Sequence, residues 1–184
     1  MVDELFKLDR EMNMEKYSLK QLALYFERYH GCILKITTEK RYIECKINKN
    51  SFPHLIGMQY AFKNIKGSNE YLGASGFEKI KNWEVTYEGI MRKIKNSQSN
   101  IAWANVKNRI KYLPMFLNKL NKTNFLIKDD NLLCRKTYLK GNYFLYRSLF
   151  NNFFPILSLK SINDIKVIIE TFIVDNDLSL IGLL

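Results

Sequence analysis

The spacing of hydrophobic residues first predicts a helix near the start of the chain. Within residues 14–29, apolar side chains recur every three or four positions, as in Leu19, Leu22 and Phe26. This is the period of an amphipathic helix that buries one face. Gly31 follows at the point where a glycine commonly ends a helix.

The spacing then changes to alternation, which predicts a β-hairpin. Apolar residues occupy every second position of residues 32–36 and again of residues 43–47. Alternation places such residues on one face of a strand, and the polar stretch 38–40 between the two runs suits a turn. Three further helices are predicted, at residues 51–62 with Ser51 as N-cap, at 77–95, and at 101–120 with a kink or split at Pro114.

Short strand-like segments rich in aromatic and β-branched residues dominate the remainder. They span residues 125–128, 132–138, 143–149, 155–160 and 167–174. Turn-forming residues such as Gly141 and Asn142 separate them. Helices followed by consecutive strands favour an α+β fold. We expect an antiparallel sheet of four to six strands with helices on one side, in a single domain over residues 1–184.

The charge of the chain points to an acidic partner. Its 184 residues include 29 Lys and Arg against 18 Asp and Glu, a formal net charge of +11. Residues 89–128 contain no acidic residue. Such a surplus attracts polyanions, of which nucleic acid is the commonest in a cell. We expect phosphate contacts from Arg92, Lys93, Lys107, Arg109, Lys111 and Lys136. An acidic protein is the alternative partner.

Two aromatic residues lie among these cations, namely Trp103 and Tyr112. Aromatic faces beside cations suit single-stranded nucleic acid, whose bases stack while its phosphates pair. The alternative is that both residues belong to the core side of an amphipathic helix, which the alanines on either side of Trp103 favour.

Several classes of site and location are not expected. Three cysteines at long spacings form no zinc motif and no disulfide framework, which favours a reducing, cytoplasmic compartment. The acidic N-terminal residues do not form a signal peptide, and no apolar run is long enough to span a membrane. No phosphate-binding loop or metal motif is present, so we expect neither a cofactor nor a metal.

The chain has two histidines, and their settings differ. His30 follows the first predicted helix, where a capping or surface role is the ordinary expectation. His54 stands in the sequence Phe-Pro-His-Leu-Ile-Gly, between the predicted hairpin and a helix. An oriented, partly buried histidine can transfer protons at neutral pH. A histidine that only closes the helix start is the alternative.

This box, after a strand hairpin, resembles a family of phage- and mobile-element-associated nuclease-like domains grouped with barnase, EndoU, the tRNase colicins and RelE. The run Glu170-Thr171-Phe172-Ile173-Val174 resembles the late strand of that family, and the similarity spans roughly residues 17–174. The resemblance implies one nuclease-like domain of this α+β type. Residues of about 77–122 would then form a helical insertion.

The resemblance further implies metal-independent cleavage of RNA, in which the 2′-hydroxyl attacks its own phosphate and leaves a 2′,3′-cyclic phosphate. His54 would be the proton carrier, with Tyr146 as a substitute, and Thr171 would orient a phosphate oxygen. Arg135 and Arg147, with Lys136, would hold the phosphate. The protein would then be a toxin or effector of a mobile element, with an acidic antitoxin as a possible partner. The alternative is a non-catalytic nucleic-acid-binding or inhibitory module on the same fold.

Overall fold

The computed structural model describes residues 2–37, 42–63, 65–96, 100–127, 141–147 and 153–175. The chain forms two compact units, which we describe one at a time. The helical unit comprises Met1–His30 and Asn48–Asn118, and the sheet unit comprises Gly31–Ile47 and Lys119–Leu184. The predicted single domain and its insertion at about 77–122 stay predictions.

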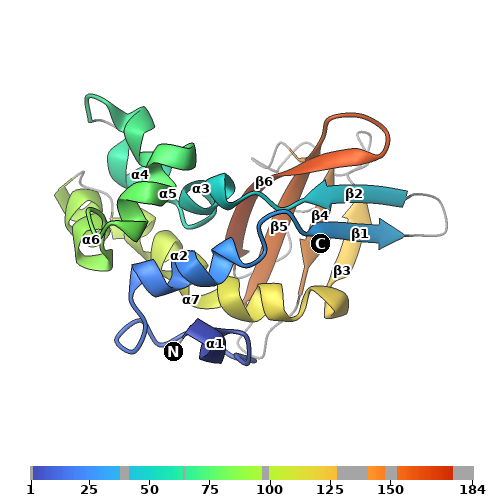
Figure 1. Cartoon of the computed structure of the whole chain (residues 1–184), viewed down its shortest axis with the longest axis horizontal. Coiled ribbons are helices and arrows are strands. Elements are labelled where there is room, and N and C mark those ends of the chain that lie inside the picture. The colour runs from blue at the N-terminus through green and yellow to red at the C-terminus, as the bar shows by residue number, and fades with distance from the viewer. Residues whose placement is uncertain are drawn as a thin grey trace. The chain divides into compact units, whose positions relative to one another are not determined.

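The helical unit contains seven α-helices and two short 3-10 helices among the described residues (Figure 1). They are α1 (Val2–Leu5), α2 (Leu19–Glu27), η1 (Lys49–Ser51), α3 (Phe52–Leu55), α4 (Met58–Phe62), η2 (Ser68–Tyr71), α5 (Gly73–Lys81), α6 (Tyr87–Asn96) and α7 (Asn100–Asn118).

Helix α2 begins later than its hydrophobic pattern predicts, because a capping box fixes its start. The Gln21 backbone N–H donates to Ser18 Oγ over 3.2 Å, and the Ser18 N–H donates to Gln21 Oε1 over 2.7 Å. These two bonds satisfy amide groups that a helix N-terminus leaves unpaired. Leu22 and Phe26 are fully buried, so the predicted face is the core face.

The other predicted helices differ from the structure in where they are interrupted. Residues 51–62 form two short helices, since Gly57 between them has a left-handed backbone with φ of +86°. Asn48, not Ser51, caps this region, by accepting the Asn50 N–H over 3.0 Å. Residues 77–95 are also two helices, α5 and α6. By contrast, α7 is not split and continues through Pro114.

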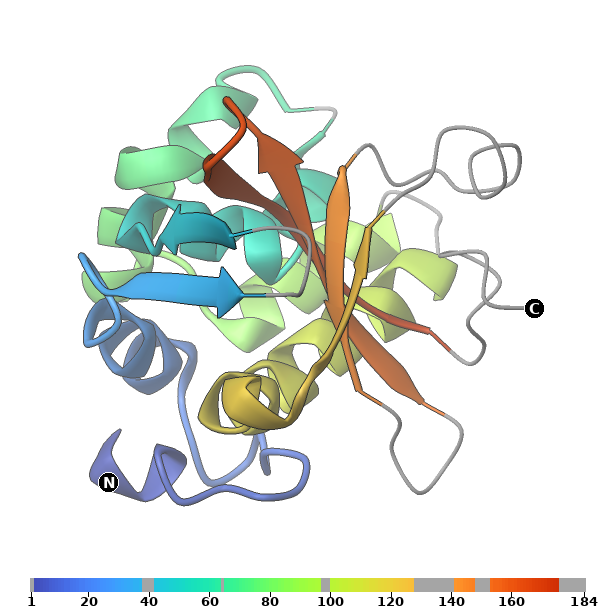
Figure 2. The same cartoon turned by 90° about the vertical axis from the view of Figure 1, so that its right-hand side faces the viewer.

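The sheet unit contains a six-stranded sheet in its described part, and the helix-plus-strand content confirms the α+β class. A 3-10 helix, η3 (Leu120–Lys122), precedes its third strand. The strands are β1 (Ile33–Thr37), β2 (Tyr42–Lys46), β3 (Asn124–Ile127), β4 (Tyr143–Tyr146), β5 (Phe154–Ser161) and β6 (Lys166–Asp175). Their order across the sheet is β1-β2-β6-β5-β4-β3. Figure 2 shows the four later strands, in yellow to red, side by side.

The sheet is mixed, so the prediction of an antiparallel sheet is wrong in one place. β2 pairs with β6 in parallel over two residue pairs, Glu44 with Lys166 and Cys45 with Val167, whereas the other four pairings are antiparallel. The antiparallel strands follow one another along the chain. β2 and β6 are separated by most of the chain, so no turn fixes their relative direction. The placement of helices on one side of the sheet stays a prediction.

The middle of the sheet is buried along consecutive residues. Ile156, Leu157 and Ser158 of β5 are each at most 1% exposed, although neighbours in a strand point to opposite faces. Phe144 of β4 packs with Ile156 in a buried cluster on one face. A fully buried serine between hydrophobic residues requires a hydrogen-bond partner.

Candidate functional site

The histidine box of the helical unit is built so that every residue except His54 is buried. Phe52, Leu55 and Ile56 are not measurably exposed, and His54 is half-buried. Gly57 closes the box in a left-handed conformation, and a Cβ there would lie 2.9 Å from Val106 Cγ2 of α7. Packing therefore explains the apolar positions of the box. His54 is the position that remains accessible.

His30 has a structural contact, as its place after the first helix predicts. The side chain is exposed, and its Nδ1 accepts the backbone N–H of Lys49 over 3.3 Å. The contact links the end of α2 to η1 within the helical unit.

The predicted phosphate contacts of the helical unit divide into exposed and occupied residues. Arg92 and Lys93 of α6 and Lys107 of α7 are exposed. Lys111 is paired instead, with its Nζ 2.9 Å from Glu11 Oε2. The hydrogen bond from Lys111 is the main cause that lowers the pKa of Glu11 below its ordinary value. Lys111 is therefore already paired with a carboxylate, and Arg92, Lys93 and Lys107 are more accessible to a phosphate.

Arg109 is buried, in contrast to the expectation that it lies on a positive surface. Only 4% of the residue is exposed, and its guanidinium lies 5.1 Å from the ring centroid of Tyr60. Its Nη2 donates to the Tyr60 hydroxyl over 3.3 Å. Burial lowers the pKa of Arg109 from its ordinary value. Its neighbours one helical turn away, Val106 and Leu113, are buried core residues, and this places Arg109 on the inner face of α7.

The two aromatic residues of α7 also differ in accessibility. Tyr112 is 8% exposed, which agrees with a core position and not with a stacking platform. Trp103 is half-buried.

In the sheet unit, a register irregularity gathers three polar residues. Ser158 of β5 stands opposite Thr171 of β6, but the next pair is Leu159 with Ile169. Glu170 is thus an extra residue on β6, the arrangement of a β-bulge. A bulge lets two successive residues face the same partner. Accordingly, Ser158 Oγ donates to Glu170 Oε2 over 2.6 Å.

Gly141 completes this cluster by leaving room for it. A Cβ at Gly141 would lie 2.1 Å from Ser158 Oγ and 3.0 Å from Glu170 Oε2. The contact with Ser158 Oγ is too short for any Cβ and the contact with Glu170 Oε2 is tighter than usual, so a larger residue here would displace the serine. We call Gly141, Ser158, Glu170 and Thr171 the bulge cluster. It places a carboxylate beside two hydroxyl-bearing residues.

Two more of the predicted site residues lie at the end of β4. Tyr146 pairs in register with Ile156 and is half-buried against the cluster of Phe144 and Ile156. Arg147 follows it, and its backbone N–H donates to Pro155 O over 3.2 Å. The Arg147 Nη1 is buried, without a hydrogen-bond partner among the described residues. A buried, unsatisfied guanidinium nitrogen is costly, unless an anion completes it.

The remaining predicted site residues, Arg135 and Lys136, lie outside the described residues. His54 belongs to the helical unit, whereas Tyr146, Arg147 and Thr171 belong to the sheet unit. The structure therefore brings Thr171 together with Ser158 and Glu170, two residues that the sequence did not single out. The assignment of His54, Arg135, Arg147, Tyr146 and Thr171 to catalysis stays a prediction.

The sequence carried one signal for the bulge cluster. Glu170 is the only charged residue within residues 167–174, a run that otherwise reads as a buried strand. A charge inside such a run must find a polar partner, and the buried Ser158 provides it.

Within the described part of the chain, no three His, Cys, Asp or Glu side chains lie close enough to hold a metal ion. Nor does any described helix have the length and apolar character needed to cross a membrane.

Comparison with known proteins gives one match. A family model described as phage-Barnase-EndoU-ColicinE5/D-RelE like nuclease4 matches residues 18–179. No curated protein and no solved structure matches the chain. The matched range includes both the histidine box and the strand that carries Glu170 and Thr171. The chain therefore belongs to this family of nuclease-like proteins that is described together with barnase, EndoU, colicins E5 and D, and RelE.

Proposed function

We propose that this protein is a metal-independent endoribonuclease that cleaves RNA through attack of the 2′-hydroxyl on the adjacent phosphate. The observation that carries the proposal is the bulge cluster, because it sets the carboxylate of Glu170 2.6 Å from the Ser158 hydroxyl oxygen on a strand of a nuclease-like family. Bulges commonly redirect side chains next to active sites.

The reaction requires two proton transfers. The O2′–P bond forms as a base takes the proton of the 2′-hydroxyl, and the P–O5′ bond breaks as an acid returns a proton to O5′. Carboxylates and imidazoles are the usual carriers. Glu170 is our candidate for the first transfer, since a carboxylate that already accepts the Ser158 hydroxyl is held in one orientation. His54 of the helical unit is the second candidate, supported by its partial exposure in an otherwise buried box.

The reaction also requires groups that hold the phosphate as its charge increases. Arg147 is the candidate, because its Nη1 is buried and lacks a partner among the described residues. An arginine fork suits a phosphate, since it can donate two parallel hydrogen bonds. Thr171 is the candidate for orienting a phosphate oxygen. Tyr146 is an alternative proton carrier. Arg135 and Lys136 are further phosphate candidates.

The net charge of +11 favours a polyanionic substrate and fast encounter with it. The family description names phage together with colicins E5 and D and RelE, which supports a role as a toxin or effector of a mobile element. A toxin of this charge would be neutralised by an acidic protein partner. We propose that such a partner covers the exposed cations Arg92, Lys93 and Lys107.

The test is incubation of purified protein with total RNA and, separately, with single-stranded DNA, each with and without a chelator. We expect RNA fragments at equal rates in both conditions and intact DNA, because DNA lacks the attacking hydroxyl. RNA that stays intact while it binds would favour a non-catalytic binding module. Cleavage that stops when the chelator is added would refute the metal-independent reaction.

A further inference from the structure

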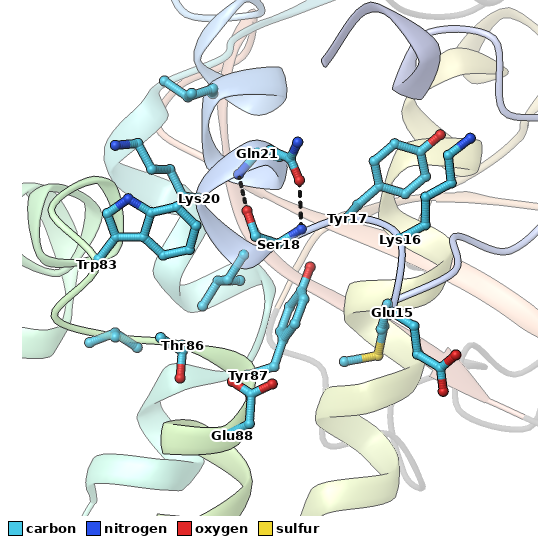
Figure 3. A pocket seen from close by; sticks show the side chains of 14 residues that line it. Glu15, Lys16, Tyr17, Ser18, Lys20, Gln21, Trp83, Thr86, Tyr87 and Glu88 are labelled. Carbon is cyan, nitrogen blue, oxygen red and sulfur yellow. Dashed lines mark hydrogen bonds between the residues drawn. The ribbon is translucent and has the colours of Figure 1, made fainter. Parts of the chain in front are cut away.

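A cavity in the helical unit lies apart from the residues assigned above. It is open to solvent on one side and has a volume of about 590 Å³, between the start of α2 and the segment that joins α5 to α6. Figure 3 shows the side chains that line it, among them Tyr17, Lys20, Trp83, Thr86 and Tyr87. A cavity of this volume is within the range that binds small organic groups.

Trp83 stands at one edge of the cavity in a strained conformation. Its φ is +65°, and it is the one non-glycine residue with positive φ among those described. The helix ending accounts for this backbone: the Trp83 N–H donates to Ile80 O over 3.2 Å and the Glu84 N–H donates to Lys79 O over 2.9 Å, the two bonds of a cap that closes α5 with a left-handed residue. Glycine is the usual residue at this position, and here it is a tryptophan that is 56% exposed. The cap therefore leaves an indole at the surface beside the cavity.

A lysine lies beside this indole. The Lys20 Nζ is 5.4 Å from the ring centroid of Trp83, and Figure 3 shows the two side chains next to each other. No acidic residue of the described chain pairs with Lys20. Lys20 thus lies over one face of an exposed indole, and a cation next to an exposed aromatic ring suits a stacked base with its phosphate.

Tyr87 contributes an unused hydrogen-bond donor to the same cavity. Only 8% of the residue is exposed, and its hydroxyl has no hydrogen-bond partner among the described residues. The hydroxyl of Tyr17, by contrast, donates to Glu4 Oε2 over 2.9 Å. Burial raises the pKa of Tyr87, so its proton stays in place. A buried hydroxyl without a partner, in the wall of a cavity, is completed by a polar atom of a ligand.

We propose that this cavity binds an unpaired nucleobase of a single-stranded nucleic acid, stacked on Trp83, with Lys20 on the flanking phosphate and the Tyr87 hydroxyl donating to the base edge. This inference rests on the proposed function only for the class of substrate. The cavity recognises the strand and does no chemistry. A nucleobase fits better than an apolar side chain of a protein, because Lys20 and the Tyr87 hydroxyl both require polar, electron-rich atoms.

Binding is tested with an all-deoxy oligonucleotide, which attack by a 2′-hydroxyl cannot cleave. The chain has two tryptophans, so the Trp103→Phe variant leaves Trp83 as the only indole. We expect the oligonucleotide to quench the tryptophan fluorescence of Trp83, and the quenching should reach saturation. An abasic strand of equal length and charge is expected to bind at least fivefold more weakly. Equal affinity for both strands would overturn the proposal, because charge alone would then account for binding.

Substitutions of the cavity residues test the role of each residue in binding. Trp83→Gly suits the positive φ, so the fold should be retained, while affinity for a dye-labelled oligonucleotide should fall about five- to hundredfold, the range for loss of one stacked base. Tyr87→Phe should weaken binding of base-bearing strands and leave that of abasic strands unchanged. Ile162→Ala, at an exposed residue of the sheet unit, serves as the control with unchanged affinity. Unaltered affinity in Trp83→Gly would exclude the cavity as a base site.

Cleavage assays on the same variants separate the two proposals. Weaker binding by Trp83→Gly in a protein that never cleaves RNA would support the cavity and refute the endoribonuclease. Full cleavage with unchanged binding in Trp83→Gly would refute the base site in the cavity and support the endoribonuclease. Quenching of Trp83 by an aromatic peptide but not by the oligonucleotide would also overturn the nucleobase assignment.

Discussion

Ser158 Oγ donates a 2.6 Å hydrogen bond to Glu170 Oε2, although the two residues are not a register pair of the sheet. The bulge makes this contact, because it lets Glu170 and Thr171 both face Ser158. Gly141 leaves the space that the contact needs. A serine that is fully buried between hydrophobic residues thus has a charged partner.

Replacing Glu170 with glutamine tests this carboxylate. The amide oxygen still accepts the Ser158 hydroxyl, so we expect a urea midpoint close to that of the wild type. RNA cleavage should slow by about a hundred- to ten-thousandfold, since an amide cannot take up a proton. Asp164→Asn, in the exposed turn before β6, is the matched control and should cleave at the normal rate. Full activity of Glu170→Gln would remove Glu170 from the reaction.

The two histidines allow a paired experiment. His54→Ala should slow cleavage by about a hundred- to ten-thousandfold without loss of RNA affinity or of the fold, because the buried neighbours of His54 remain. His30→Ala loses only the contact to the Lys49 N–H and should cleave normally. Retained cleavage in His54→Ala would make that histidine a structural residue.

Salt dependence distinguishes exposed from paired cations. If Lys107 contacts a phosphate, Lys107→Ala should reduce the slope of log affinity against log salt by about 1, the effect of one lost counterion release. Lys111→Ala, one helical turn away, should change the slope less, because Lys111 is bound to Glu11. Identical slopes for wild type and Lys107→Ala would show that this face does not bind RNA.

The stability of the helical unit should depend on pH through Glu27. Its carboxylate lies 2.9 Å from Lys49 Nζ and 3.2 Å from Lys81 Nζ, and the hydrogen bond from Lys49, ahead of that from Lys81, lowers the pKa of Glu27 in the folded state. A folded pKa below the unfolded value stabilises the fold above about pH 4.5, and this stabilisation is lost as pH falls through the folded pKa.

Urea unfolding of Glu27→Gln should therefore show a loss of about 1 kcal/mol at pH 7, which disappears near pH 2. Glu78→Gln is the weaker comparison, since Glu78 is 52% exposed and lies 3.6 Å from the same Lys49. A loss at pH 7 that persists unchanged at pH 2 would show that the amide disturbs packing and not an ion pair.

Local patterns predicted the local parts of the fold. The alternation around Leu34 and Cys45 predicted the β1–β2 hairpin, and the structure pairs the two strands antiparallel with Leu34 opposite Cys45. The parallel contact of Cys45 with Val167 joins distant segments, and no sequence pattern reports it. The break between α5 and α6 was also hidden, since a tryptophan such as Trp83 gives no sign of a left-handed backbone.

The candidate site was predictable to a similar extent. The box around His54 stands out because one polar residue interrupts a buried run. The lone charge of Glu170 marks its strand in the same way, but the β-branched residues on both sides of it hide the change of phase between Ile169 and Phe172, so the bulge itself was not predictable. Arg109 was placed on the surface by its charge, although its buried neighbours at helical spacing already indicated the inner face.

The most direct test of the account is the chemical nature of the RNA ends that the purified protein produces in the presence of a chelator. Attack by the 2′-hydroxyl predicts fragments that end in 2′,3′-cyclic phosphate, with 5′-hydroxyl ends on the following fragments. A strand with one 2′-deoxy substitution at the cleaved position should resist cutting there. Fragments that carry 5′-phosphate and 3′-hydroxyl ends, or cleavage at the deoxy position, would contradict the mechanism, because water would then be the attacking group.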